Sequence, residues 1–140
     1  ASALVLMSGS QAEARGLKPM ARIVAHARHS QHPSEFTIAP IDAVNKLFAK
    51  TGWTAADVDL FEINEAFAMV TMLAMQDLGL DHNKVNIHGG ACAQGHPIGS
   101  TGSRIIVSLM YALQKLGKKR GVAALCIGGG EATAVAIELI

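Results

Sequence analysis

Residues 121–140 read "GVAALCIGGGEATAVAIELI" and decide the fold class. Two apolar runs flank three consecutive glycines at residues 128–130, a pattern typical of two neighbouring strands joined by a tight turn. The stretch before them, residues 97–119, has the spacing of a long helix with Pro97 near its first position. A long helix that leads into a pair of buried strands indicates an α/β protein.

The same alternation of strand and helix is found upstream. We expect apolar strands at residues 1–8, 20–30, 57–63 and 84–90, and helices at residues 9–19, 41–51 and 64–80, the second of which should end at Gly52. The helix at residues 64–80 is apolar on nearly every face, so we expect it to be central, with Asn64 as its N-cap. This order predicts a mostly parallel sheet with crossover helices and one antiparallel hairpin.

Composition narrows the class of protein. The chain has 140 residues, 50% hydrophobic and 16% charged, with a formal net charge of +1. This suits one well-packed domain, and the small charge gives no reason to expect nucleic acid or an anionic membrane as partner. No apolar stretch reaches the roughly 20 residues of a membrane span. The only cysteines, Cys92 and Cys126, are too few for a disulfide framework and predict a cytoplasmic protein.

The beginning of the chain has no methionine and no charged-then-apolar leader. It reads "ASALVLMSGS", which we interpret as a strand already in progress. We therefore expect the chain to be a piece of a longer protein.

Three polar residues each lie at the end of a predicted strand or in the loop that follows one. They are Asn64, His96 and Cys126. Reactive groups gather at the carboxyl ends of strands in such sheets, so we expect the three to meet at one edge. Each also has a purely structural interpretation. Asn64 and His96 can serve as helix caps, and Cys126 can be a small buried thiol.

The chemistry of these residue types is complementary. A neutral imidazole at His96, beside a helix N-terminus, can accept a proton from a thiol or donate a hydrogen bond to an enolate oxygen. A thiolate at Cys126 can act as nucleophile or base, and the glycines that follow can offer N–H groups to an oxyanion. The Asn64 amide can fix a water molecule that donates to a developing negative charge.

Three strings carry a resemblance to a known family. In order and spacing, "NEAFA" (64–68), "GGACAQGHPIGSTGSR" (89–104) and "CIGGGEATAVAIE" (126–138) resemble the C-terminal signatures of thiolases. The likeness covers essentially the whole chain and is strongest to bacterial acetyl-CoA acetyltransferases. It implies a thiolase-like C-terminal domain with a five-stranded mixed sheet layered with helices. It also implies an acyltransferase of fatty acid metabolism that condenses two acetyl-CoA into acetoacetyl-CoA or runs the reverse cleavage.

The resemblance implies a role for each polar residue. His96 would activate an acyl-accepting cysteine and contact the thioester oxygen of the second acyl-CoA, while Cys126 would remove a proton from its acetyl group. Asn64 would hold the water that, with His96, stabilises the enolate, and the backbone N–H of Gly128 would help stabilise the tetrahedral oxyanion. The walls of the acyl pocket would be Ala66, Phe67 and Phe36.

The resemblance also indicates what this chain lacks. The family's nucleophilic cysteine lies in the N-terminal half, and Cys92 does not stand in its place, so we expect the isolated chain to be inactive. Residues 1–19 would be a segment returning from the absent N-terminal domain, and residues 20–140 the C-terminal domain. The loop domain, which supplies most of the coenzyme A site, is absent as well. His88 and Glu131 stand where many relatives have asparagine and a small or uncharged residue.

The implied partners are acetyl-CoA, acetoacetyl-CoA and coenzyme A as substrates, without a resident cofactor, and further copies of the chain in a dimer or homotetramer. Two other functions stay open: a longer-chain degradative 3-ketoacyl-CoA thiolase and a non-catalytic acyl-CoA-binding module. A metal site would require helical spacing, which the intervening glycines disfavour. Its ligands would be His88, Cys92, His96 and Cys126.

Overall fold

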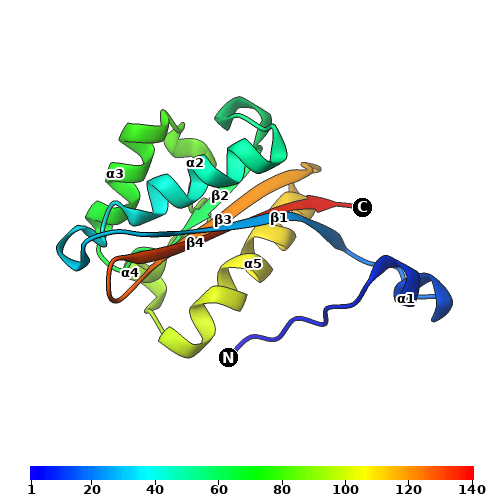
Figure 1. The fold of residues 1–140 in the computed structure, drawn as a ribbon. Coiled ribbons are helices and arrows are strands. Elements are labelled where there is room, and N and C mark those ends of the chain that lie inside the picture. The colour runs from blue at the N-terminus through cyan, green and yellow to red at the C-terminus, as the bar shows by residue number, and fades with distance from the viewer.

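The computed structural model describes all 140 residues and shows an α/β fold in which one sheet separates two layers of helices (Figure 1). The strands are β1 Ala21–Ser30, β2 Leu60–Ile63, β3 Arg120–Ile127 and β4 Glu131–Leu139, in the spatial order β1-β4-β3-β2. β2 and β3 pair in parallel, whereas β4 runs antiparallel to both of its neighbours. The predicted α/β fold with a mixed sheet is confirmed. The expectation of a mostly parallel sheet is wrong, because β2 and β3 form the one parallel pair and the other two pairs are antiparallel.

The chain forms five α-helices. They are α1 Gly9–Ala14, α2 Ala39–Thr51, α3 Ala68–Leu78, α4 Ala91–Gln94 and α5 Ile98–Lys115. α2 and α3 lie on one side of the sheet and α5 on the other (Figure 1). α2 ends at Gly52, whose left-handed backbone closes the helix as the sequence predicts. None of the helices is both long enough and apolar enough to cross a membrane.

Two hydrophobic cores follow from the alternation of side chains along the strands. On the side of α2, Phe61 is buried in one cluster with Leu47. On the side of α5, Leu60 is buried with Leu109. Gly121 of β3 lets this helix approach closely, because a Cβ there would lie 2.8 Å from Cγ of Leu109. The apolar runs of β2 and β3 therefore reflect a sheet that is covered on both faces.

The sheet has four strands rather than the five that we expected. At residues 84–90, Val85 makes only one isolated bridge to Phe61, and Asn86 then turns the chain away with a φ of 48°. The Asn86 side chain takes over the pairing: its Oδ1 accepts the Ile63 N–H and its Nδ2 donates to the Ile63 carbonyl, both at 2.8 Å. A carboxamide offers the same donor and acceptor as a peptide group, so these groups of Ile63 are satisfied without a fifth strand.

The expected buried strand at residues 1–8 is wrong. The segment is extended but pairs with no strand, and Val5 and Leu6 are 85% and 71% exposed. It runs below the sheet towards α1 (Figure 1), and the Ser2 hydroxyl donates to the Ser100 carbonyl of α5 at 3.2 Å. An apolar run is buried as a strand only where neighbouring elements cover it, and here none does.

The expectations for the helix at residues 64–80 are also wrong. α3 begins at Ala68, and its N-cap position is Phe67 rather than Asn64. Asn64 still belongs to the strand ladder, because its N–H donates to the Ala124 carbonyl at 2.9 Å. A residue held in that ladder cannot cap a helix that starts four residues later. α3 is not central either, since Met72 is 63% exposed.

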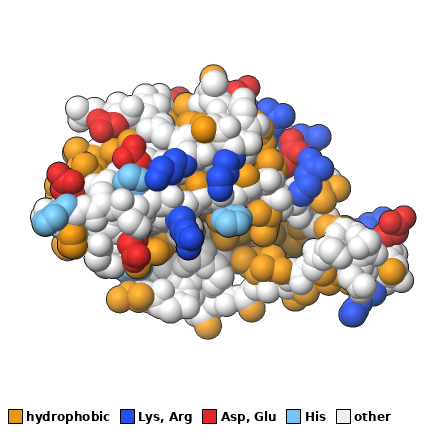
Figure 2. Space-filling model, in the orientation of Figure 1, with side chains coloured by type: hydrophobic (Ala, Val, Ile, Leu, Met, Phe, Trp, Pro, Cys, Tyr) orange, Lys and Arg blue, Asp and Glu red, His pale blue; other side chains and the backbone are white.

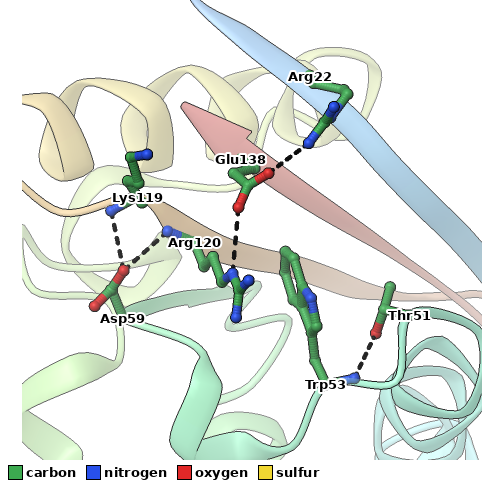
Figure 3. Close-up of polar contacts among 7 residues, drawn as sticks. All are labelled: Arg22, Thr51, Trp53, Asp59, Lys119, Arg120 and Glu138. Atoms are coloured by element: carbon green, nitrogen blue, oxygen red, sulfur yellow. Dashed lines mark hydrogen bonds and ion pairs between the residues drawn. The ribbon is translucent and has the colours of Figure 1, made fainter. Parts of the chain in front are cut away.

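A network of charged residues fixes the end of the sheet where β3 begins (Figure 3). Asp59 accepts two backbone N–H groups at the start of β3, both at 2.9 Å. The Arg120 guanidinium lies 4.9 Å from the centre of the Trp53 ring, and its Nε is 3.3 Å from Glu138. Hydrogen bonds from Arg22, which has the larger effect, and from Arg120 lower the pKa of Glu138. These contacts connect β1, β3 and β4 to the segment before β2.

Basic side chains line the free edge of β1. Arg22, His26 and Arg28 are exposed on this strand, and Figure 2 shows Lys, Arg and His side chains across the middle of the face that β1 and α2 present. Lys50 of α2 donates to the His26 carbonyl at 2.9 Å. Charged side chains along an edge strand disfavour pairing with the edge of another sheet.

Candidate active site

Asn64 and Cys126 lie at the same edge of the sheet because β2 and β3 are parallel neighbours. Ile63 is paired with Ala124, so Asn64 follows the end of β2 while Cys126 is the penultimate residue of β3. The Asn64 N–H donates to the Ala124 carbonyl, two residues before Cys126. This is the carboxyl edge of these strands, where α/β folds place their reactive groups.

The Asn64 carboxamide is buried without a partner. The residue is 2% exposed, and neither Nδ2 nor Oδ1 forms a hydrogen bond within the chain. Leaving a buried polar group unpaired costs about 1–3 kcal/mol, so such groups in folded proteins call for a specific explanation. A carboxamide in this condition is suited to hold a water molecule or a substrate oxygen.

His96 is exposed and is oriented by a buried threonine. Its Nδ1 lies 2.7 Å from Oγ1 of Thr101, which also donates to the Pro97 carbonyl at 3.1 Å. When the hydroxyl proton points to Pro97, the oxygen accepts Nδ1–H and leaves a lone pair on Nε2. When the proton points to Nδ1, Nε2 carries hydrogen and can donate. Thr101, which we did not single out in the sequence, thus supports both tautomers.

Cys126 is 7% exposed, and burial raises the pKa of its thiol. A thiol in this environment is neutral until a neighbouring positive charge or hydrogen-bond donor stabilises the thiolate. Cys126 can therefore take part in proton transfer only together with other groups that face it.

The turn after Cys126 is fixed by close backbone contacts. Gly129 and Gly130 have φ values of 101° and 85°, in the region that favours glycine. The Gly130 carbonyl accepts the Gln31 N–H at 2.9 Å, and a Cβ on Gly130 would overlap the Gln31 carbonyl. Gly128 is exposed at the start of this turn. The end of β1 and the β3–β4 turn are thereby held together at one end of the sheet (Figure 1).

Two of the residues expected to wall an acyl pocket are in contact. The rings of Phe36 and Phe67 are 6.1 Å apart between centroids and meet edge to face at 60°. Phe67 is 58% exposed and Phe36 is half-buried, while Ala66 directly precedes Phe67 in the chain. Edge-to-face packing of this kind holds both rings in a defined orientation.

Glu65 connects the segment of Asn64 to the loop before His96. Its Oε2 accepts the Cys92 N–H at 2.8 Å, and its Oε1 lies 3.3 Å from Nδ2 of Asn86. The Glu65 carboxylate therefore joins the first two strings identified in the sequence. The third string begins two residues after Ala124, whose carbonyl accepts the Asn64 N–H. The side chains of Asn64, His96 and Cys126 do not hydrogen-bond to one another. No three His, Cys, Asp or Glu side chains lie close enough together to hold a metal ion.

The fold and this set of segments define a recognised class of domain. Residues 17–139 match the family model described as "Thiolase, C-terminal domain", and the chain therefore belongs to the thiolase family.

Named relatives refine this classification. The chain is 51% identical to the cytosolic acetyl-CoA acetyltransferase of Mus musculus, over 99% of its own length and 35% of the mouse protein. It is equally similar to an acetyl-CoA acetyltransferase of Allochromatium vinosum, with 51% identity over 99% of the chain and 35% of that protein. It spans about a third of the length of these relatives.

Solved structures give the same classification. The acetyl-CoA acetyltransferase of Bacillus anthracis superposes with a TM-score of 0.93 at 43% identity, over 96% of this chain and 34% of that one. The Acat5 thiolase of Ascaris suum, solved in complex with coenzyme A, gives a TM-score of 0.90 at 41% identity, over 95% and 34%.

Proposed function

We propose that the chain is the C-terminal part of an acetyl-CoA C-acetyltransferase, which joins two acetyl-CoA into acetoacetyl-CoA or cleaves acetoacetyl-CoA with coenzyme A. The names of the relatives support the reaction class. The observation that carries the proposal is the buried, unpartnered carboxamide of Asn64, on a segment that bonds to β3 through the Asn64 N–H and to the loop before His96 through Glu65.

The first half of the proposed reaction forms an acyl-enzyme. A cysteine in the rest of the protein attacks the thioester carbon of one acetyl-CoA, and Nε2 of His96 accepts the proton of that cysteine. The C–S bond to coenzyme A then breaks, and the Cys126 thiol gives its proton to the departing thiolate, which leaves Cys126 as a thiolate and His96 protonated. The tautomer with Nδ1–H bonded to Thr101 leaves Nε2 free for this step.

The second half forms the carbon–carbon bond. The Cys126 thiolate removes a proton from the methyl group of a second acetyl-CoA, and the enolate oxygen accepts hydrogen bonds from His96 and from a water held by Asn64. The carbanion attacks the acyl-enzyme carbonyl, whose developing oxyanion accepts the Gly128 N–H. The C–S bond to the enzyme breaks, and His96 returns its proton to the released cysteine, while Cys126 keeps the proton that it removed from the methyl group.

We propose that residues 1–19 belong structurally to an N-terminal domain and residues 20–140 form the C-terminal domain. Exposed Val5 and Leu6 in an extended, unpaired segment support this, because apolar side chains on such a segment suit a strand of another sheet. The chain has only Cys92 and Cys126, neither of which we assign as the acyl-accepting cysteine.

A chimera tests the proposal. Residues 1–140 replace the corresponding C-terminal third of the Allochromatium vinosum relative, and acetoacetyl-CoA cleavage is measured for the chimera and for the 140-residue chain alone. We expect turnover by the chimera and none by the isolated chain. A well-folded but inactive chimera would refute the proposed function. Cleavage by the isolated chain would refute the claim that the chain lacks the acyl-accepting cysteine.

The contact between Phe36 and Phe67 favours a short acyl group over the longer chains of degradative thiolases. If both rings wall the acyl pocket, their edge-to-face packing limits its depth. We therefore propose acetoacetyl-CoA as the preferred substrate. To distinguish the two functions, the rate at which the chimera cleaves acetoacetyl-CoA is compared with its rates for longer 3-ketoacyl-CoA esters.

A further inference from the structure

The Glu65 carboxylate is bound from two sides. One oxygen accepts the Cys92 backbone N–H at 2.8 Å and the other accepts from Asn86 Nδ2 at 3.3 Å. Gly90 lies against the same carboxyl group, and a Cβ at that position would overlap it. Both partners of the carboxylate are far from Glu65 in sequence, and it fits only because Gly90 lacks a side chain.

Asn86 is bound just as completely. Its Oδ1 and Nδ2 hold the N–H and the carbonyl of Ile63, and the second hydrogen of Nδ2 reaches Glu65. Ile63 directly precedes Asn64. All of the hydrogen bonds that the Asn86 side chain forms therefore go to Ile63 and Glu65, the residues on either side of Asn64. These bonds explain why the chain accepts a left-handed backbone at Asn86.

We propose that Glu65 and Asn86 form one positioning unit, the Glu65–Asn86 clamp, which fixes the Asn64 carboxamide relative to the loop that carries His96. This inference rests on the proposed function, since the clamp matters only if Asn64 and His96 act on the same substrate. Neither clamp residue touches the reacting atoms. They act by holding Ile63 on one side and residues 90–92 on the other.

The consequence for catalysis follows from geometry. A displacement of about 1 Å between groups that stabilise one transition state can lower turnover by about 100-fold, while ground-state binding by the rest of the substrate is retained. Loss of the clamp should therefore lower kcat and leave KM nearly unchanged. A residue with only a structural role would instead lower the fraction of folded enzyme, without changing turnover per folded molecule.

Cys92 supplies an independent probe of the clamp in solution. Its thiol is exposed, and the Glu65 carboxylate, which accepts the Cys92 backbone N–H, raises the pKa of that thiol. Replacing Glu65 by glutamine removes the charge, so more Cys92 is thiolate at neutral pH and alkylation accelerates. The buried thiol of Cys126 provides the internal reference.

The experiment has two arms. On the 140-residue chain, Cys92 alkylation by iodoacetamide is followed by mass spectrometry for wild type and Glu65→Gln, with an expected increase of about threefold or more in the variant. In the chimera, kcat and KM are measured for Glu65→Gln, Asn86→Asp and the control Asn83→Ala. Asn83 is exposed, and its side chain bonds only to Asp81.

We expect both clamp variants to lower kcat by about 10-fold or more with KM within about threefold of wild type, and the control to change neither. Partial recovery of the Asn86→Asp variant at lower pH is expected too, since protonation removes the repulsion with Glu65 and restores a donor. Unchanged alkylation in Glu65→Gln, or unchanged kcat per folded enzyme in both variants, would overturn the clamp. An inactive wild-type chimera would instead count against the proposed function, and the alkylation rates still test the contact.

Discussion

At the scale of single residues, the Thr101 hydroxyl decides what His96 can do. It is fully buried, it lies 2.7 Å from Nδ1, and its proton can be shared between the imidazole and the Pro97 carbonyl. The proposed reaction needs Nε2 first as an acceptor and then as a donor. A residue that accommodates both states without moving the ring is suited to that sequence.

Replacing Thr101 by valine in the chimera removes the hydroxyl and keeps the branched shape. We expect kcat to fall by about 10- to 100-fold, because His96 loses both its orientation and its support for either tautomer. Thr101→Ser keeps the hydroxyl and should stay within a few-fold of wild type. Steady-state cleavage of acetoacetyl-CoA measures both, and equal kcat values for the valine and serine variants would contradict this role.

At the scale of elements, β2 buries a carboxyl group. Glu62 is 5% exposed, and it lies on the face of β2 that Leu60 turns towards α5. Burial raises its pKa from 4.5 to about 7, a shift that Arg104 reduces and Glu65 increases. Because the folded state holds its proton to higher pH than the unfolded state, folding loses stability as pH rises from 4.5 to about 7.

The loss of stability from Glu62 should reach about 3 kcal/mol above pH 7. Glu62→Gln keeps the shape without the charge, so the free energy of unfolding should rise at pH 8 by up to this amount and depend less on pH. Urea unfolding of the 140-residue chain at pH 5 and pH 8 measures this. Glu13→Gln, at an exposed position of α1, is the control. The hypothesis fails if Glu62→Gln shows the pH dependence of wild type.

At the scale of the whole molecule, residues 1–8 add no buried residue to the hydrophobic cores. Val5 and Leu6 bury little surface in this chain, whereas Leu109 is fully buried under the sheet. Lysine at both exposed positions should therefore change the unfolding free energy of the isolated chain by less than about 1 kcal/mol, while Leu109→Ala should cost about 2–5 kcal/mol. Urea unfolding measures both.

The same Val5→Lys/Leu6→Lys variant has a different outcome in the chimera if residues 1–19 join an N-terminal domain. Burial of two lysines would then lower Tm by about 5 °C or more, which differential scanning calorimetry detects. Equal tolerance in the chimera and in the isolated chain would count against that division of the chain.

Much of the fold was predictable from local pattern. The apolar runs around residues 128–130 predicted β3 and β4, and Gly52 predicted the end of α2, because these features depend on neighbouring residues. The predictions for residues 1–8, for the start of α3 and for a fifth strand were wrong. In each case contacts between distant residues decide the outcome. Residues 1–8 have no strand to pair with, Asn64 is bonded to Ala124 instead of capping α3, and the Asn86 side chain bonds to Ile63 in place of a fifth strand.

The amino-acid order by itself determined the class of fold, the strings shared with thiolases and the three polar residues proposed for the chemistry, since these depend on residue type and spacing. Only the tertiary structure showed that Thr101 orients His96 and that Glu65 and Asn86 join segments about 20 to 30 residues apart. Spacing along the chain cannot reveal such contacts. They arise when parallel strands bring their carboxyl ends to one edge, where hydrogen-bonding groups from distant segments come within reach of one another.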